Sequence, residues 1–184
     1  TRRAAALGGH VPTFYRQPLE IVRGSGVHVW DAQGRQYLDC YNNVPHVGHC
    51  HPRVVDAIAQ QAATLNTHTR YVHPMVVEYV ERLCAKFDHG LTQAIMVCTG
   101  SEANYVALRM AQAATGARGV IATDATYHGN TSAVSALSTR RPPIGGYPPH
   151  VRLVPAPQEG MSGETFAANL ATANAGLITD MIVC

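Results

Sequence analysis

The sequence predicts an α/β fold in which helices flank an incomplete, mainly parallel sheet, and three observations lead to that class. Short apolar runs of strand length alternate with longer segments whose apolar residues recur at helical spacing. Proline and glycine mark most of the boundaries between these segments. Polar loops follow two of the apolar runs, at the strand ends where ligands of parallel sheets bind.

The first part of the chain predicts an arm, a hairpin and a loop. Residues 1–18 show no clear periodicity and are interpreted as the arm. Strands are expected at residues 19–23, 27–30 and 36–40, with the turn signal Asp31-Ala-Gln-Gly34 inside the hairpin. Residues 41–52, rich in asparagine, histidine and glycine, are expected to form a loop.

Two amphipathic helices are expected next. The first begins at Pro52, because proline suits the first helical position, and its apolar stripe is Val55, Ile58, Ala62 and Leu65. The second begins at Pro74, with an expected buried face of Val76, Val80, Leu83 and Phe87. The only lysine of the chain, Lys86, lies beside that face, where a positive charge complements the end of a helix.

The second half of the chain carries the alternation that predicts the parallel sheet. Strands are expected at residues 94–98, 119–123, 151–154 and 177–183. Helices are expected at residues 101–115, 131–137 and 163–175, and loops at residues 124–130 and 140–149.

The stretch Val97-Cys-Thr-Gly-Ser-Glu-Ala-Asn104 predicts a phosphate-binding corner between a strand and a helix. Gly100 permits a tight turn, and Ser101 is a favourable N-cap for the helix that follows. A helix start presents free N–H groups and the positive end of its dipole, which favour a phosphate. An ordinary strand-to-helix turn is the alternative interpretation of this stretch alone.

Composition limits the classes of function. With 184 residues, 46% of them hydrophobic, the chain can form one sizeable core. A net charge of +2 without a basic stripe gives no support for binding nucleic acid or a membrane surface, so a small polar substrate is expected. The five cysteines form no Cys-x-x-Cys pair, which fits a reducing, cytoplasmic location.

Two histidine-containing segments could carry chemistry. His46, His49 and His51 suggest a metal site, but the spacing is typical of a loop and no acidic residue or Cys-x-x-Cys pair accompanies it. Histidines that hydrogen-bond the loop and cap the following helix are the favoured interpretation. Tyr127 and His128 could form an acid/base pair, or an aromatic platform in a loop that Gly129 brings close to a ligand. Arg70, Arg140 and Arg141 are candidates for binding an anionic group.

Three motifs, in order along the chain, resemble those of the class III, pyridoxal-phosphate-dependent aminotransferases, which have the aspartate-aminotransferase fold (fold type I). They are Tyr37-Leu-Asp-Cys40 with Gly48-His-Cys-His-Pro52, Thr99-Gly-Ser-Glu-Ala-Asn104, and Tyr127-His-Gly129. Within the family, residues 37–52 and 65–73 are most similar to ethanolamine-phosphate phospho-lyase and its alanine–glyoxylate aminotransferase relatives.

The resemblance implies a role for each matching residue. Gly100 and Ser101 would bind the phosphate of pyridoxal 5'-phosphate through backbone N–H groups and the hydroxyl, and Tyr127 would stack on its ring. Thr99 and His128 would belong to the same cofactor site. Asn42 and Asn43 would line the substrate pocket, and Arg70 would lie near the interface of a homodimer, where it could meet an anionic substrate group. No metal is implied.

The resemblance also predicts what this chain lacks. The family's Schiff-base lysine and its pyridinium-binding aspartate motif have no counterpart here, so we expect a truncated amino-terminal portion without catalytic residues, inactive alone. Residues 1–45 would be an N-terminal arm and hairpin in the small domain, and residues 46–184 part of the large cofactor-binding domain.

The complete protein is predicted to transfer an amino group from an amine or amino acid to a keto acid. A phospho-lyase acting on a phospho-amine with the same cofactor is the first alternative. A non-catalytic module that binds a metal or a phosphate is the second.

Overall fold

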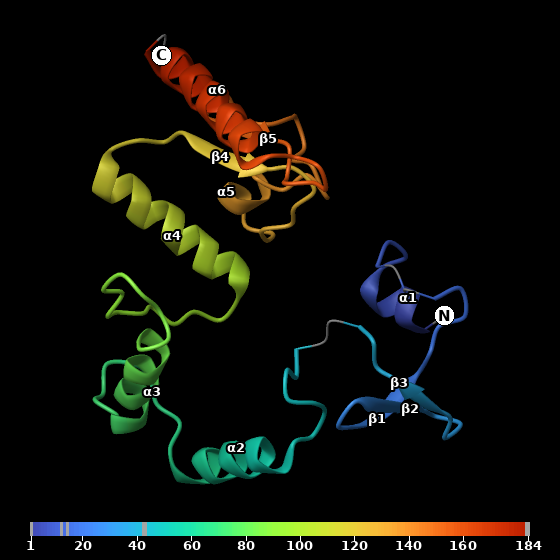
Figure 1. The fold of residues 1–184 in the computed structure, drawn as a ribbon. Helices are drawn as coiled ribbons and strands as arrows, with labels where there is room; N and C mark the ends of the chain where they lie inside the picture. Colours follow the sequence, from blue (N-terminus) through green and yellow to red (C-terminus); the bar gives the residue numbers. More distant parts are fainter. Residues whose placement is uncertain (1, 12, 14, 42–43, 183–184) are drawn as a thin grey trace. The chain divides into compact units, whose positions relative to one another are not determined.

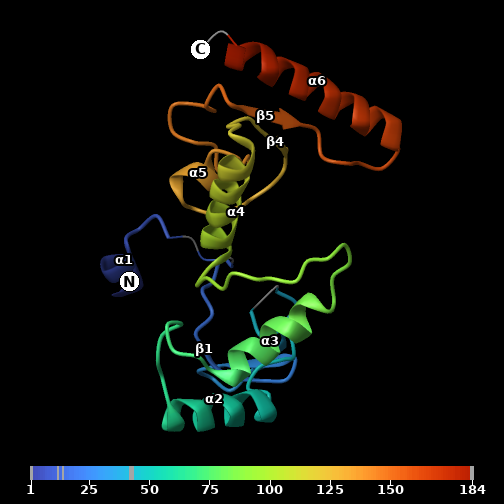
Figure 2. The same cartoon turned by 90° about the vertical axis from the view of Figure 1, so that its left-hand side faces the viewer.

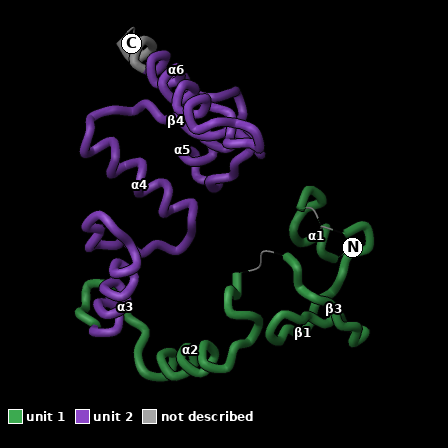
Figure 3. Tube along the Cα trace, in the orientation of Figure 1, with its two compact units in different colours: residues 1–73 green, residues 74–184 purple. Residues whose placement is uncertain are grey.

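The structure is a computed structural model that describes residues 2–11, 13, 15–41 and 44–182, with side chains described up to Leu177. The chain divides into two compact units, Thr1–His73 and Pro74–Cys184 (Figure 3). This division falls at a different place from the predicted boundary after residue 45. The predicted assignment concerns the domains of a complete subunit and stays a prediction.

The first unit contains an antiparallel sheet between two helices in the sequence. Helix α1 (Arg2–Leu7) lies within the predicted arm, and α2 (Pro52–Thr64) begins at the predicted proline. The three strands are β1 (Ile21–Ser25), β2 (His28–Asp31) and β3 (Gln36–Leu38), paired in that order. The N–H of Gly34 donates to the carbonyl of Asp31 (3.0 Å) in the turn between β2 and β3, which confirms the predicted hairpin.

A buried carboxylate ties this hairpin together. The side chain of Asp31 accepts hydrogen bonds from the backbone N–H groups of Gln33 and Arg35, from Arg35 Nε (2.7 Å) and from the Tyr37 hydroxyl (2.8 Å). Burial alone would raise the pKa of Asp31, but the hydrogen bonds from Tyr37 and Arg35, with the charge of Arg35, lower it to about 2. The same contacts raise the pKa of Arg35 and of Tyr37.

The expected buried face of α3 (Pro74–Cys84) is wrong for the described part of the chain, where neither α3 nor the amphipathic α2 buries a residue. Ile58 of the α2 stripe is 65% exposed, and Val76 of the α3 stripe is 53% exposed. Phe87 lies beyond the end of α3 and is also exposed. An amphipathic pattern shows which face is suited to burial, but burial also needs a packing partner.

The second unit contains the parallel strand pair that the alternation predicts. Strand β4 (Val120–Thr123) pairs in parallel with β5 (Val151–Val154), and the intervening α5 (Ser132–Ser135) contributes the fully buried Val134. Helix α6 (Gly163–Ile182) packs against both strands, beside which it lies in both views (Figure 1, Figure 2). Ala122, Leu137 and Val151 form the core, with Leu108 of α4 (Gly100–Thr115) packed against it.

The α/β class is confirmed, but two predicted strands are wrong. Residues 94–98 form no strand, and Ile95 is 61% exposed. The run expected as a strand at residues 177–183 continues α6 as far as Ile182, where the description ends. Short apolar runs do not distinguish strand from helix, and a helix extends with its own hydrogen bonds whereas a strand needs a neighbour. Among the described helices, none has the length and apolar character needed to cross a membrane.

Candidate phosphate and aromatic-platform site

Two hydrogen bonds, made by the side chains of Thr99 and Glu102, cap the start of helix α4. Thr99 is the N-cap, with extended backbone, and its hydroxyl oxygen accepts a hydrogen bond from the N–H of Glu102 (3.1 Å). The Glu102 carboxylate in turn accepts from the N–H of Cys98 (2.9 Å). The prediction that Ser101 is the N-cap is therefore wrong, because Thr99 with Glu102 three positions later matches the capping-box pattern.

This cap leaves donors at the helix start. Within the described ranges, the backbone N–H groups of Gly100 and Ser101 have no acceptor in the protein, as expected at the first positions of a helix. They lie at the positive end of a 16-residue helix, and Ser101 adds a hydroxyl that can donate. These groups fit a phosphate, and a negative charge there is favoured.

A loop from the end of β4 docks on the same helix start. The N–H of Asn130 donates to Ser101 Oγ (3.1 Å), and the Asn104 side-chain amide donates to the carbonyl of His128 (2.8 Å). Between them, Gly129 has φ +138°, and a Cβ at this position would lie 2.4 Å from Ser101 Oγ and 2.8 Å from Ser101 Cα. Only a glycine permits this approach of the loop to α4.

The other side of the loop is also tied. The N–H of His128 donates to Oγ of Ser138 (3.0 Å), a residue only 1% exposed. The N–H of Thr126 donates to Thr139 Oγ1 (3.0 Å), and the carbonyl of Thr126 accepts from the N–H of Thr139 (3.1 Å). The backbone on both sides of Tyr127 is thus held, while the Tyr127 side chain is 52% exposed. The arrangement presents an aromatic ring on a fixed backbone.

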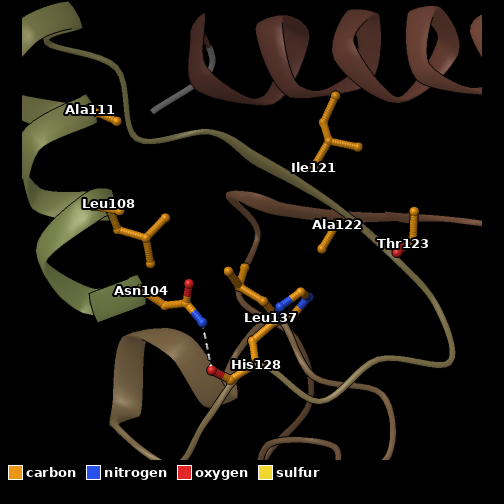
Figure 4. Close-up of a pocket in the computed structure, with 9 residues that line it drawn as sticks. Asn104, Leu108, Ala111, Ile121, Ala122, Thr123, His128 and Leu137 are labelled. Atoms are coloured by element: carbon orange, nitrogen blue, oxygen red, sulfur yellow. Dashed lines mark hydrogen bonds between the residues drawn. The ribbon is translucent and has the colours of Figure 1, made fainter. Parts of the chain in front are cut away.

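A cavity of about 460 Å³ lies between α4, β4 and this loop (Figure 4). His128 Nε2 is buried without a hydrogen-bond partner among the described residues. Gly100, Ser101 and Tyr127 do not line the cavity, so it is a feature separate from the donors at the helix start. Its lining is mostly apolar and consists of Asn104, Ala107, Leu108, Ala111, Ile121, Ala122, Thr123, His128 and Leu137.

The other predicted site residues lie in the first unit. Asn42 and Asn43 fall outside the described residues. Arg70 is exposed, and its N–H donates to His68 Nδ1 (3.1 Å). Thr99, Gly100, Ser101, Tyr127 and His128 belong to the second unit, and hydrogen bonds around the start of α4 bring them together.

The geometry gives no support to the metal interpretation of the histidine segment. In the part of the chain that the structure describes, no three metal-ligating side chains lie close enough together to hold an ion. His49 instead faces the Asp39 carboxylate, with 2.6 Å between His49 Nε2 and Asp39 Oδ2. The backbone of His49 also pairs with Gly26, which joins the loop to the hairpin. These contacts match the expectation that the histidines hydrogen-bond the loop. The expectation that they also cap the following helix is wrong, because His51 is the N-cap of α2 but its side chain makes no capping hydrogen bond.

Sequence reasoning did not identify several residues that build this site. The Thr99 cap carries a local signal, because Glu102 follows at the capping-box distance. Asn104 was quoted only as part of a motif, and Asn130 and Ser138 were given no role. Their partners are between 10 and 29 positions away in sequence, so no short-range pattern could have indicated them.

Comparison with known proteins gives a consistent picture. The family model described as aminotransferase class-III matches residues 11–180. An alanine–glyoxylate aminotransferase 2-like protein of Drosophila melanogaster is 42% identical over 155 residues, which are 82% of this chain and 31% of that protein.

Two solved structures extend the comparison. A phospholyase from Arthrobacter, solved in complex with phosphoethanolamine, is 47% identical with a TM-score of 0.89, over 97% of this chain and 44% of that one. The ornithine aminotransferase of Toxoplasma gondii is 26% identical with a TM-score of 0.65, over 85% of this chain and 40% of that one. Its structure has partial occupancy of pyridoxal phosphate at the active site. The chain spans less than half the length of each of these relatives.

Proposed function

The chain belongs to the class III aminotransferase family, and from this premise we propose that the protein uses pyridoxal phosphate to transfer an amino group between an amine or amino acid and a keto acid. The observation that carries the proposal is the loop containing Gly129, which docks beside free N–H groups at the start of α4. Family membership and the related structures support pyridoxal phosphate as the cofactor.

The residues of α4 and the loop would hold the cofactor from two sides. The N–H groups of Gly100 and Ser101 and the Ser101 hydroxyl would bind its phosphate, with Thr99 holding the helix start in place. Tyr127 would cover one face of its ring, supported by the backbone of His128. When bound, the cofactor supplies the carbonyl group that captures an amine and a ring that withdraws electrons from it.

The proton transfers of such a reaction are not assigned to this chain. Lys86 is the only lysine, and it is exposed just after the end of α3. We therefore propose that the 184-residue chain alone does not catalyse amino transfer. Asn42, Asn43 and Arg70 remain proposed substrate-binding residues, and the complete protein is proposed to be a cytoplasmic homodimer with its active site near the subunit interface.

A second reaction has a specific observation in its favour. The Arthrobacter phospholyase that binds phosphoethanolamine is 47% identical to this chain. The same cofactor site would then serve the elimination of phosphate from a phospho-amine. Both reactions use an amine that bonds the cofactor, so they share the contacts of Gly100, Ser101 and Tyr127.

An assay with two products separates the reactions. A subunit that carries this chain together with the family's lysine is supplied with phosphoethanolamine, or with an amine and a keto acid. Keto-acid-dependent formation of a new amino acid supports amino transfer, and phosphate release without a keto acid supports elimination. If neither product forms with either set of substrates, both proposals are contradicted.

Binding by the 184-residue chain tests the cofactor site itself. We expect inorganic phosphate to compete with pyridoxamine 5'-phosphate, because both would occupy the start of α4. Ser101→Ala should lower the affinity for both ligands roughly tenfold, since it removes a hydrogen bond to a charged group. Isothermal titration calorimetry measures both affinities, and Ser135→Ala on α5 is the matched control. Pyridoxamine 5'-phosphate that binds without competition from phosphate would contradict the assignment.

A further inference from the structure

The backbone that follows Tyr127 is attached to α4 at two points. Asn104 Nδ2 donates to the carbonyl of His128, and Ser101 Oγ accepts from the N–H of Asn130. Ser101 and Asn104 are three positions apart on one helix, so they lie on the same face. Figure 4 shows the Asn104 side chain pointing from α4 to the His128 carbonyl.

The two attachments differ in whether the side chain belongs to the proposed phosphate-binding group. The Ser101 hydroxyl is part of the phosphate corner, so its loss would change phosphate binding and loop docking together. The Asn104 amide lies one helical turn beyond Gly100 and donates a hydrogen bond to the carbonyl of His128. It therefore acts on the loop without belonging to the phosphate donors.

We propose that Asn104 is a positioning residue, which holds the loop so that the ring of Tyr127 stays at a fixed distance from the phosphate donors of the same helix. This inference rests on the proposed cofactor site and deepens it. A ligand with a phosphate and a ring must meet Ser101 and Tyr127 at once, and its binding therefore depends on their spacing. A ligand with only a phosphate does not depend on it.

The exposure of the residues separates positioning from folding. Asn104 is exposed, so water can replace its hydrogen bond when the partner is lost. Ser138, which holds the His128 N–H from the other side, is almost fully buried, and its truncation would leave that N–H unpaired. Asn104 is therefore the residue at which the loop can be released with little effect on the fold.

The experiment compares two ligands on one variant. The 184-residue chain carrying Asn104→Leu is titrated with pyridoxamine 5'-phosphate and, separately, with inorganic phosphate. We expect the affinity for pyridoxamine 5'-phosphate to fall about three- to tenfold, as for the loss of one positioning hydrogen bond, while phosphate affinity changes less than about twofold. Hydrogen exchange of the backbone N–H of Asn130 should become faster in the same variant.

The controls separate the possible failures. Gln112→Leu, an exposed change on the same helix, should change neither affinity, and Asn104→Ala, which favours the helix, repeats the test if leucine disturbs folding. An unchanged ratio of the two affinities in Asn104→Leu or Asn104→Ala would overturn the positioning role alone. A wild-type chain that binds pyridoxamine 5'-phosphate no more tightly than phosphate would overturn both this role and the cofactor site.

Discussion

Two polar clusters, one in each unit, differ in what their hydrogen bonds leave unpaired. In the first unit, Asp31 is 2% exposed, and its carboxylate accepts hydrogen bonds from two backbone N–H groups, a guanidinium and a phenol. In the second unit, the side chains of Ser101 and Asn104 hold a loop, while the N–H groups of Gly100 and Ser101 stay without an acceptor among the described residues.

The difference distinguishes a structural cluster from the proposed binding site. The carboxylate of Asp31 accepts four hydrogen bonds from residues of the hairpin, so the cluster stabilises the turn. At the start of α4 the hydrogen bonds fix the position of the loop and leave donors and an exposed ring available. Three substitutions test this difference between the clusters. In order of decreasing expected effect they are Gly129→Ala, Asp31→Asn and Thr99→Ala.

Gly129→Ala should have the largest effect, because its Cβ would overlap Ser101 and the backbone has a positive φ. We expect a loss of about 3 kcal/mol in the free energy of unfolding of the second unit, together with loss of loop docking. Urea denaturation measures this change in the free energy of unfolding. Gly145→Ala is the control, since Gly145 has φ +90° but open space around it, and strain alone costs about 1 kcal/mol. Equal losses in the two variants would contradict the close approach.

Asp31→Asn should have the next largest effect, confined to the hairpin. The pKa of Asp31 is lowered from 3.8 to about 2 in the folded chain, so its stabilisation is complete above about pH 4 and is lost as the pH falls toward 2. The variant should be less stable than wild type at neutral pH, and this difference should disappear near pH 2.

The fluorescence of Trp30, the only tryptophan, reports this comparison because it lies next to Asp31 in β2. Asp56→Asn on the exposed α2 is the control, because it removes a carboxylate outside the hairpin. A wild-type stability that stays constant between pH 4 and pH 2 would show that the carboxylate does not stabilise the hairpin.

Thr99→Ala should have the smallest effect. Removal of the N-cap hydroxyl leaves the N–H of Glu102 without its acceptor and costs about 1 kcal/mol of unfolding free energy. Thr99→Ser, which keeps the hydroxyl, should restore most of it. Phosphate affinity should change less than about twofold, because the donors are Gly100 and Ser101. A loss of phosphate binding larger than that of Ser101→Ala would mean that Thr99 itself contacts the ligand.

Residues with local signals were predicted well. The turn at Asp31–Gly34 and Pro52 at the start of α2 each follow from a preference of one residue for one backbone conformation. The strand pair β4 and β5 was also predicted within one residue. The placement of the N-cap failed by two residues, because Ser101 and Thr99 both suit a cap and only the position of Glu102 distinguishes them.

The sequence by itself determined the family, the order of most elements and the position of the loop before α4 that is proposed to bind phosphate, because motifs and turns act through neighbouring residues. The tertiary structure decided that residues 94–98 do not pair, that α6 continues as far as Ile182, and that Asn104 and Ser138 hold the backbone next to Tyr127. These outcomes depend on partners many residues away, whose proximity arises only when the chain packs.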